Sequence, residues 1–233
     1  MRVRLLGSSL VDSAHRQYVT SFLINTSVAI DAGCIGFWGT PQQQEGVKHV
    51  FLTHSHIDHT ASLPIFIENA WTPAEGCPIV YGSHETLDDV QTHIFNNKLW
   101  PDFIAISKTM SPFLRVCPLQ AEVPACADGL TITPVRVNHV VPTLGYVIRD
   151  GESAVIFAGD SGPTERLWEI AHQTSGLRAV FLEACFPNSM TRLAEVSLHM
   201  TPEMFGREVA KMPKDITVVA VHIKVRYRDQ VIR

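Results

Sequence analysis

Four side chains that commonly bind metal ions lie within six residues, in the segment 53–59 (THSHIDH). Such a density is far above what 11 histidines in 233 residues would produce by chance. Imidazole and carboxylate groups suit Zn²⁺, Mn²⁺ or Fe²⁺, and the lack of nearby thiols argues against a closed structural zinc site. In extended backbone His54 and His56 project to one side, whereas Asp58 and His59 face differently. The segment therefore predicts a catalytic site with two divalent transition-metal ions, with zinc favoured.

Three further candidate ligands each follow an apolar run that indicates a strand. They are His139 after 135–138, Asp160 after 155–159 and His222 after 218–221. A histidine on its own is usually an ordinary surface or core residue, and we interpret His15, His49, His84, His93 and His172 in that way. Asp31, in the turn-like segment 31–33, either supports the site through hydrogen bonds or simply forms a turn.

The ordered pattern, an HxHxDH motif followed by a strand-end His, a Gly-Asp loop and a late strand-end His, resembles the metallo-β-lactamase superfamily. The likeness spans nearly the whole chain. It implies an α/β fold, a four-layered αβ/βα sandwich. It also implies the ligand sets: His54, His56 and His139 for one ion, Asp58, His59 and His222 for the other, and Asp160 between both.

Two metal ions can acidify a water molecule and offset charge on a phosphoryl or carbonyl oxygen, so the sequence favours a hydrolase. The leaving group still needs a proton, and His199, just before the helix start 201–203, lies outside the metal pattern. Glu183 could orient His199, although a solvated strand end is an equally open interpretation. The catalytic residues expected are therefore Asp58, His199 and Glu183.

Several segments resemble class II 3′,5′-cyclic-nucleotide phosphodiesterases within the superfamily: HSHIDHTASLP, LEACF, LHMTP and the late HIK. The segment 95–103 (FNNKLWPDF) adds to this likeness. The resemblance implies that this segment lies near a pocket where an aromatic ring stacks on a purine, and core packing is the alternative. The expected substrate is a small nucleotide, cyclic AMP or cyclic GMP, hydrolysed to the 5′-nucleotide.

The runner-up is a ribonuclease Z-like endonuclease, which the HxHxDH motif, Glu183 and the segment 199–201 (HMT) also resemble. Against pre-tRNA as a substrate stand the formal net charge of −4 and the lack of a Gly/Pro/Lys-rich insertion. A lactonase or thioesterase could use the same ions, with little use for Glu183 and His199. A non-hydrolytic di-iron protein is a further alternative, without a flavin or dinucleotide motif to support it.

The composition is that of an ordinary globular protein, with 45% hydrophobic and 18% charged residues. Without a linker-like tract, we expect one domain over 1–233. Five scattered cysteines argue against a disulfide framework, and no segment suggests a signal peptide or a membrane span, so we expect a cytoplasmic protein without membrane partners. A monomer and a homodimer both stay open.

Alternating apolar runs and turn residues predict the elements that position these residues. We expect strands over 3–6, 22–24, 28–30, 47–53, 78–81, 130–137, 145–148, 154–158, 179–182 and 216–221. Helices are expected over 61–71, over 84–95, from Pro163 through His172, and from the Thr201-Pro202-Glu203 start. The aromatic segment 95–107 has no clear period and could form a lid.

Overall fold

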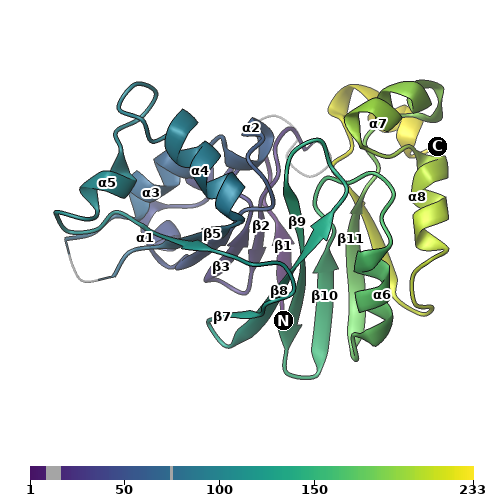
Figure 1. The fold of residues 1–233 in the computed structure, drawn as a ribbon, viewed down its shortest axis with the longest axis horizontal. Coiled ribbons are helices and arrows are strands. Elements are labelled where there is room, and N and C mark those ends of the chain that lie inside the picture. The colour runs from purple at the N-terminus through teal and green to yellow at the C-terminus, as the bar shows by residue number, and fades with distance from the viewer. Residues whose placement is uncertain (9–16, 74–75) are drawn as a thin grey trace. The chain divides into compact units, whose positions relative to one another are not determined.

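The computed structural model describes residues 1–8, 17–73 and 76–233. The chain divides into two compact units, Met1–Leu119 and Gln120–Arg233 (Figure 1). Each unit has a six-stranded sheet and helices of its own, so the structure is mixed α/β with two sheets. The single domain over 1–233 stays a prediction.

The sheet of the first unit has the strand order β1-β2-β3-β4-β5-β6. Its strands are β1 (Val3–Leu5), β2 (Phe22–Ile24), β3 (Val28–Ile30), β4 (His49–Phe51), β5 (Ile79–Gly82) and β6 (Arg115–Pro118). The first three pair in antiparallel fashion, and β3 to β6 pair in parallel. Every residue of β2 and β3 is buried, as expected of short apolar runs within a covered sheet.

Short helical segments follow β3, β4 and β5. They are the 3-10 turn η1 (Ile35–Phe37), α1 (Pro41–Glu45), α2 (Ile57–Thr60), α3 (Leu63–Ala70), α4 (His84–His93) and α5 (Phe103–Ile106). Residues Leu63, Phe66 and Ile67 of α3 lie in the apolar core of this unit. The start of α4 is fixed by Ser83, whose hydroxyl accepts a hydrogen bond from the Thr86 N–H at 3.1 Å.

The aromatic segment 95–103 belongs largely to this core. Phe95 and Phe103 are 0% and 6% exposed, and the Phe103 ring stacks on Phe113 with centroids 4.2 Å apart. Trp100 is half-buried against the same cluster. Core packing therefore accounts for the two phenylalanines, and α5 gives regular structure to part of the segment interpreted as irregular.

The sheet of the second unit has the order β12-β11-β10-β9-β8-β7. Its strands are β7 (Ala125–Ala127), β8 (Leu130–Val137), β9 (Thr143–Asp150), β10 (Ser153–Phe157), β11 (Leu177–Glu183) and β12 (Thr217–Val221). Strands β7 to β10 pair in antiparallel fashion, and β10, β11 and β12 pair in parallel. The parallel register places the ends of β11 and β12 side by side, because Glu183 pairs with Val221.

The helical segments of this unit are α6 (Arg166–Gln173), η2 (Asn188–Met190), α7 (Thr191–Ser197), α8 (Pro202–Val209), η3 (Val225–Tyr227) and α9 (Arg228–Val231). Residues Leu167 and Trp168 of α6, Ala194 of α7 and Met204 of α8 share one apolar core with the sheet. The predicted start of α8 is confirmed, with Thr201 as N-cap and a proline in the first turn.

Helix α6 begins later than predicted, at Arg166 instead of Pro163. The buried carboxylate of Glu208 accepts hydrogen bonds from the Thr164 N–H at 3.0 Å and from the Trp168 indole at 2.7 Å. This tertiary contact holds residues before the helix in a loop, which local sequence signals cannot reveal. Among the described residues, no helix has both the length and the apolar character needed to cross a membrane.

Candidate metal centre

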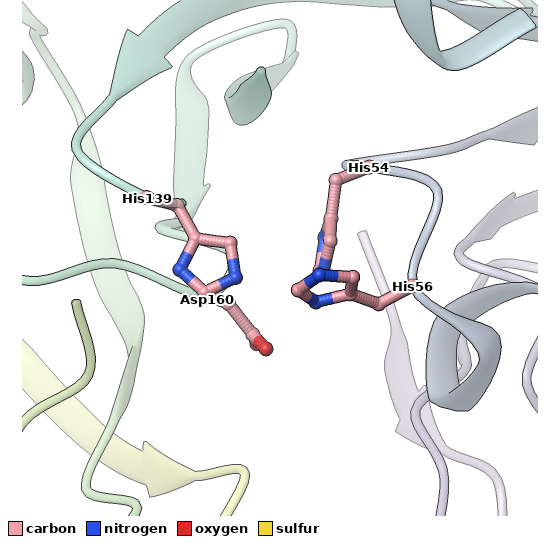
Figure 2. A group of neighbouring side chains, drawn as sticks. All are labelled: His54, His56, His139 and Asp160. Carbon is pink, nitrogen blue, oxygen red and sulfur yellow. The ribbon is translucent and has the colours of Figure 1, made fainter. Parts of the chain in front are cut away.

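The four clustered candidate ligands lie where strand β4 gives way to helix α2, as the sequence predicts. His54 and His56 are on the connecting loop, which Figure 2 shows, and Asp58 and His59 are in α2. The ring of His54 lies 4.6 Å from that of His56 and 4.2 Å from that of His59, between centroids. The extended backbone ends at His56, the N-cap of α2, so the helix sets the direction of Asp58 and His59.

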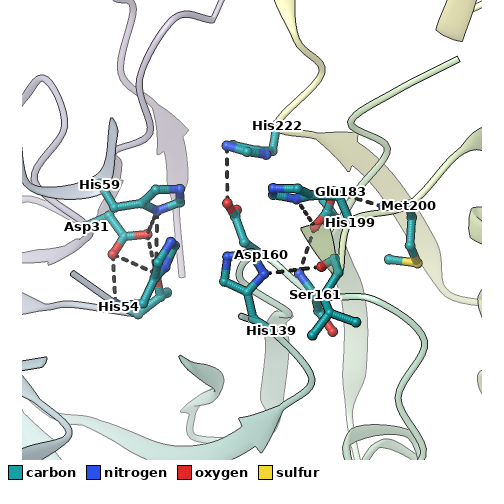
Figure 3. A network of polar contacts seen from close by, with 12 residues as sticks. Asp31, His54, His59, His139, Asp160, Ser161, Glu183, His199, Met200 and His222 are labelled. Carbon is teal, nitrogen blue, oxygen red and sulfur yellow. Dashed lines mark hydrogen bonds and ion pairs between the residues drawn. The ribbon is translucent and has the colours of Figure 1, made fainter. Parts of the chain in front are cut away.

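Asp31 forms a hydrogen-bonded anchor beneath this cluster (Figure 3). Its Oδ2 lies 2.7 Å from Nδ1 of His59, and its Oδ1 accepts from the Thr53 N–H at 2.7 Å. The Thr53 hydroxyl donates its single proton to Asp31, so it can only accept from Nδ1 of His54, 2.9 Å away. The Nδ1 atoms of His54 and His59 therefore both carry a proton. This leaves Nε2 of each ring with the lone pair that a metal ion needs.

Of the two interpretations that the sequence left open, the structure supports hydrogen bonding to the candidate ligands. Asp31 directly follows strand β3, has a left-handed φ of 61° and contacts His59 and Thr53. Thr53, which links the carboxylate to His54, was not identified from the sequence, although it begins the THSHIDH segment.

The second unit carries the other three candidate ligands, each beyond the end of a strand as predicted (Figure 3). His139 follows β8, Asp160 follows β10 and His222 follows β12. Oδ2 of Asp160 lies 3.4 Å from Nε2 of His222. Nδ1 of His139 lies 3.1 Å from the carbonyl oxygen of Leu198, which can only accept, so this nitrogen carries the proton.

Glu183 and His199 form a buried pair in the same unit (Figure 3). Oε1 of Glu183 lies 2.8 Å from Nδ1 of His199 and also accepts from the Ser161 N–H at 2.7 Å. Oε2 accepts from the Met200 N–H at 3.3 Å. Glu183 is 0% exposed, so the structure does not place it at a solvated strand end.

The electrostatic setting of Glu183 favours the retention of a proton by this pair. Burial, and then the negative charge of Asp160, raise the pKa of the Glu183 carboxyl well above its ordinary value. His222 and the N–H groups of Ser161 and Met200 act in the opposite direction. A carboxyl–imidazole pair that binds a proton readily is suited to general acid chemistry.

The histidines interpreted as ordinary residues have other surroundings where the structure describes them. His49 lies 3.1 Å from the Tyr81 hydroxyl, exposed His84 pairs with Asp88, and His172 contacts the Lys211 carbonyl oxygen at 2.9 Å. His93 is in the last turn of α4. His15 lies outside the described residues.

Comparison with known proteins connects this geometry to a family. The chain is 24% identical over 214 residues to a probable 3′,5′-cyclic-nucleotide phosphodiesterase of Yersinia pestis, a match that covers 80% of this chain and 60% of the relative. The chain thus spans about three fifths of the length of the first curated relatives it matches.

Solved structures of other proteins share the fold. Unliganded yeast PDE1 superposes with a TM-score of 0.79 at 16% identity, covering 99% of this chain and 91% of that structure. The short form of human tRNase Z gives a TM-score of 0.68 at 16% identity, covering 97% of this chain and 94% of that structure. The predicted mixed α/β class is confirmed. The family model described as "Beta-lactamase superfamily domain" matches residues 20–223, so this chain belongs to the metallo-β-lactamase superfamily that its histidine pattern resembles.

Proposed function

We propose that this protein is a metal-dependent phosphodiesterase that hydrolyses a 3′,5′-cyclic nucleotide, cyclic AMP or cyclic GMP, to the 5′-nucleotide. The observation that carries the proposal is the buried Glu183–His199 pair in the unit that also carries Asp160 and His222. Such a pair serves a reaction whose leaving group needs a proton, as the departing alkoxide of a phosphodiester does.

The residues present fit divalent metal ions. Donors on both units are imidazole and carboxylate groups, and at His54, His59 and His139 a protein oxygen at Nδ1 directs the lone pair to Nε2. We propose that His54, His56 and His139 hold one ion, that Asp58, His59 and His222 hold the other, and that Asp160 touches both. Zinc suits this ligand set best, and manganese and iron are the alternatives.

When bound, two such ions supply Lewis acidity toward the phosphate and make a water molecule a stronger nucleophile. The protein's part in the reaction is proton transfer. Glu183 keeps the proton of His199 on Nδ1, so Nε2 is the atom that can donate a proton to the departing 3′ oxygen. Because Glu183 is held by Ser161 and Met200, the imidazole it orients is fixed as well.

Two findings favour a small cyclic nucleotide over RNA. The relative from Yersinia pestis is named as a probable cyclic-nucleotide phosphodiesterase, and the net charge of −4 offers no general attraction to a polyanion. A small anionic ligand needs only the local charge of the ions. The purine contact proposed for the segment 95–103 now depends on Trp100, because Phe95 and Phe103 are core residues.

A ribonuclease Z-like endonuclease is the second candidate, because tRNase Z shares the fold. The deciding experiment is a turnover screen of the metal-loaded protein with cyclic AMP, cyclic GMP, a pre-tRNA with a 3′ trailer, a lactone and a thioester. We expect hydrolysis of a cyclic nucleotide and its loss on chelation. Cleavage of the trailer while both cyclic nucleotides survive would replace the phosphodiesterase assignment by the endonuclease.

Trp100→Ala belongs in the same screen as a test of the aromatic segment. We expect it to raise KM for a cyclic purine nucleotide, with Leu99→Ala, a change at the exposed neighbouring position, as control. Equal KM values for both variants and the wild type would remove Trp100 from substrate binding.

A further inference from the structure

Cys185 lies beside three residues that already have a role in the proposed reaction, Glu183 and His199 in proton transfer and His222 in metal binding. Glu183, Cys185, His199 and His222 each offer one ligand atom, and these four atoms lie within 4.8 Å of one another. All four residues are buried, and all belong to the second unit. The ordinary interpretation of such a cysteine is a small apolar core residue, but here its neighbours supply two nitrogens and one oxygen.

The backbone around Cys185 ties the four donors into one local structure. The Cys185 N–H donates to the Met200 carbonyl at 2.9 Å, which joins it to the segment that carries His199. The Cys185 carbonyl accepts from the Lys224 N–H at 3.2 Å, and the Ala184 N–H donates to the Val221 carbonyl at 3.0 Å. These two bonds flank His222. The spacing of the donors therefore follows from the sheet ends and not from surface side chains that meet by chance.

The chemistry of the four donors is that of a thiophilic divalent ion. One thiolate, two imidazoles and one carboxylate make a four-coordinate set of the kind that Zn²⁺ and Co²⁺ accept. Glu183 and a deprotonated Cys185 together carry two negative charges, which neutralise a divalent ion, and a neutral assembly is what a buried position favours. The thiol proton and the extra proton of the Glu183–His199 pair leave to solvent as the ion binds, because the ligand atoms must be deprotonated.

We propose that Glu183, Cys185, His199 and His222 form an inhibitory metal site for a thiophilic divalent ion. The site shares His222 with the catalytic ligand set and takes His199 and Glu183 out of proton transfer. An ion bound there therefore removes His222 from the catalytic ligand set and blocks proton transfer by His199, so the enzyme is inactive while the ion is bound. The inhibition rests on the function proposed above, whereas the binding of the ion does not.

Cobalt titration tests the binding directly. Co²⁺ is added to the metal-free full chain, and thiolate-to-cobalt charge transfer is followed in the near ultraviolet. We expect the band in the wild type and in Cys126→Ser, a change at an exposed cysteine of the same unit, and its absence in Cys185→Ser. Cobalt that binds to the wild type without a thiolate band, or a band that persists in Cys185→Ser, would overturn the proposal.

Zinc inhibition is the second readout. Excess Zn²⁺ should inhibit turnover of a cyclic nucleotide by the wild type and by Cys126→Ser. Half-inhibition of Cys185→Ser should need at least about tenfold more Zn²⁺, because even the loss of a group that only supports a ligand typically costs 10–100-fold in metal affinity. Identical inhibition of all three proteins would refute the inhibitory role. A thiolate band in a protein that hydrolyses none of the phosphodiesters would leave the metal site in place and reject the proposed function instead.

Discussion

Oε1 of Glu183 lies 2.8 Å from Nδ1 of His199 and is the same oxygen that accepts the Ser161 N–H at 2.7 Å. One carboxylate oxygen therefore contacts both the proposed proton donor and the residue that follows Asp160 in the chain. Movement of Glu183 would disturb proton transfer and metal binding together. Substitution of Glu183 should therefore affect both proton transfer and metal binding, whereas substitution of His199 should affect proton transfer alone.

His199→Ala should retain its metal ions and lose on the order of a hundredfold or more in turnover of a cyclic nucleotide, the usual scale of general acid catalysis. The loss should shrink for bis-p-nitrophenyl phosphate, whose leaving group departs without protonation. Steady-state rates on both substrates provide the measurement, with Glu195→Gln on the exposed side of α7 as control. An equal loss on both substrates would show that His199 positions the substrate instead.

Glu183→Gln should reduce turnover and also weaken metal binding. The amide keeps an acceptor oxygen but cannot gain or lose a proton, so the pH–rate profile should lose the step that the raised pKa of the Glu183 carboxyl contributes. A profile recorded beside metal analysis checks both parts. An unchanged profile with reduced metal content would restrict Glu183 to a role in holding the Asp160 loop.

Asp31→Asn should weaken metal binding by roughly 10–100-fold, because supporting carboxylates orient histidine ligands and increase their basicity. Asp31 is 1% exposed and contacts His59 and Thr53, so the effect arises beneath the ligands and not at the substrate. Competition with a chromophoric chelator measures the affinity. Asp88→Asn, at an exposed position on α4, is the matched control, and equal affinities for the two variants would contradict the proposed support.

Gly33→Ala should destabilise the first unit by about 1–3 kcal/mol, the usual cost of inserting an atom into packed structure. A Cβ at Gly33 would lie 2.3 Å from the Asp58 carbonyl oxygen and 2.7 Å from the Thr20 nitrogen. These two backbone atoms are hydrogen-bonded to each other at 2.8 Å and cannot both retreat.

The control for Gly33 is Gly206→Ala, where a Cβ inside helix α8 would meet nothing within 4 Å. Alanine there should stabilise the protein by roughly 0.5–1 kcal/mol, because glycine is the weaker helix former. Urea unfolding of the two variants should give changes of opposite sign. Destabilisation of the same size in both would show that close approach at Gly33 is not the cause.

Local sequence signals located some of the elements that position the candidate ligands. Strand β8, which precedes His139, and the short strands β2 and β3 have the predicted bounds, because apolar alternation and flanking turn residues act within a few positions. Helix α2, which carries Asp58 and His59, was not predicted, because apolar residues at helical spacing begin only at residue 61. Weakly apolar elements such as β6, β7 and α7 gave no such signal and were not predicted.

The contacts that fix the candidate ligands could not be predicted, because they join segments far apart in the sequence. The Leu198 carbonyl that contacts His139 and the Ser161 N–H that contacts Glu183 are backbone groups, which residue type does not reveal. Leu198 adopts a left-handed φ of 51° at the end of α7, an uncommon conformation for a leucine. Only the three-dimensional course of the chain shows these partners.

Asp160→Ala should lower the affinity for both ions, whereas His139→Ala should weaken one. Asp160 is 2% exposed with Oδ2 3.4 Å from His222, and we propose that its carboxylate touches both ions, so its removal takes a ligand and a negative charge from each. His139 belongs to a single proposed set. Elemental analysis after saturation and gel filtration should give two ions per chain for the wild type and for Asp229→Ala, an exposed control, about one for His139→Ala and fewer for Asp160→Ala. Loss of a single ion in Asp160→Ala would assign the carboxylate to one ion, and the second would then need another ligand in its place.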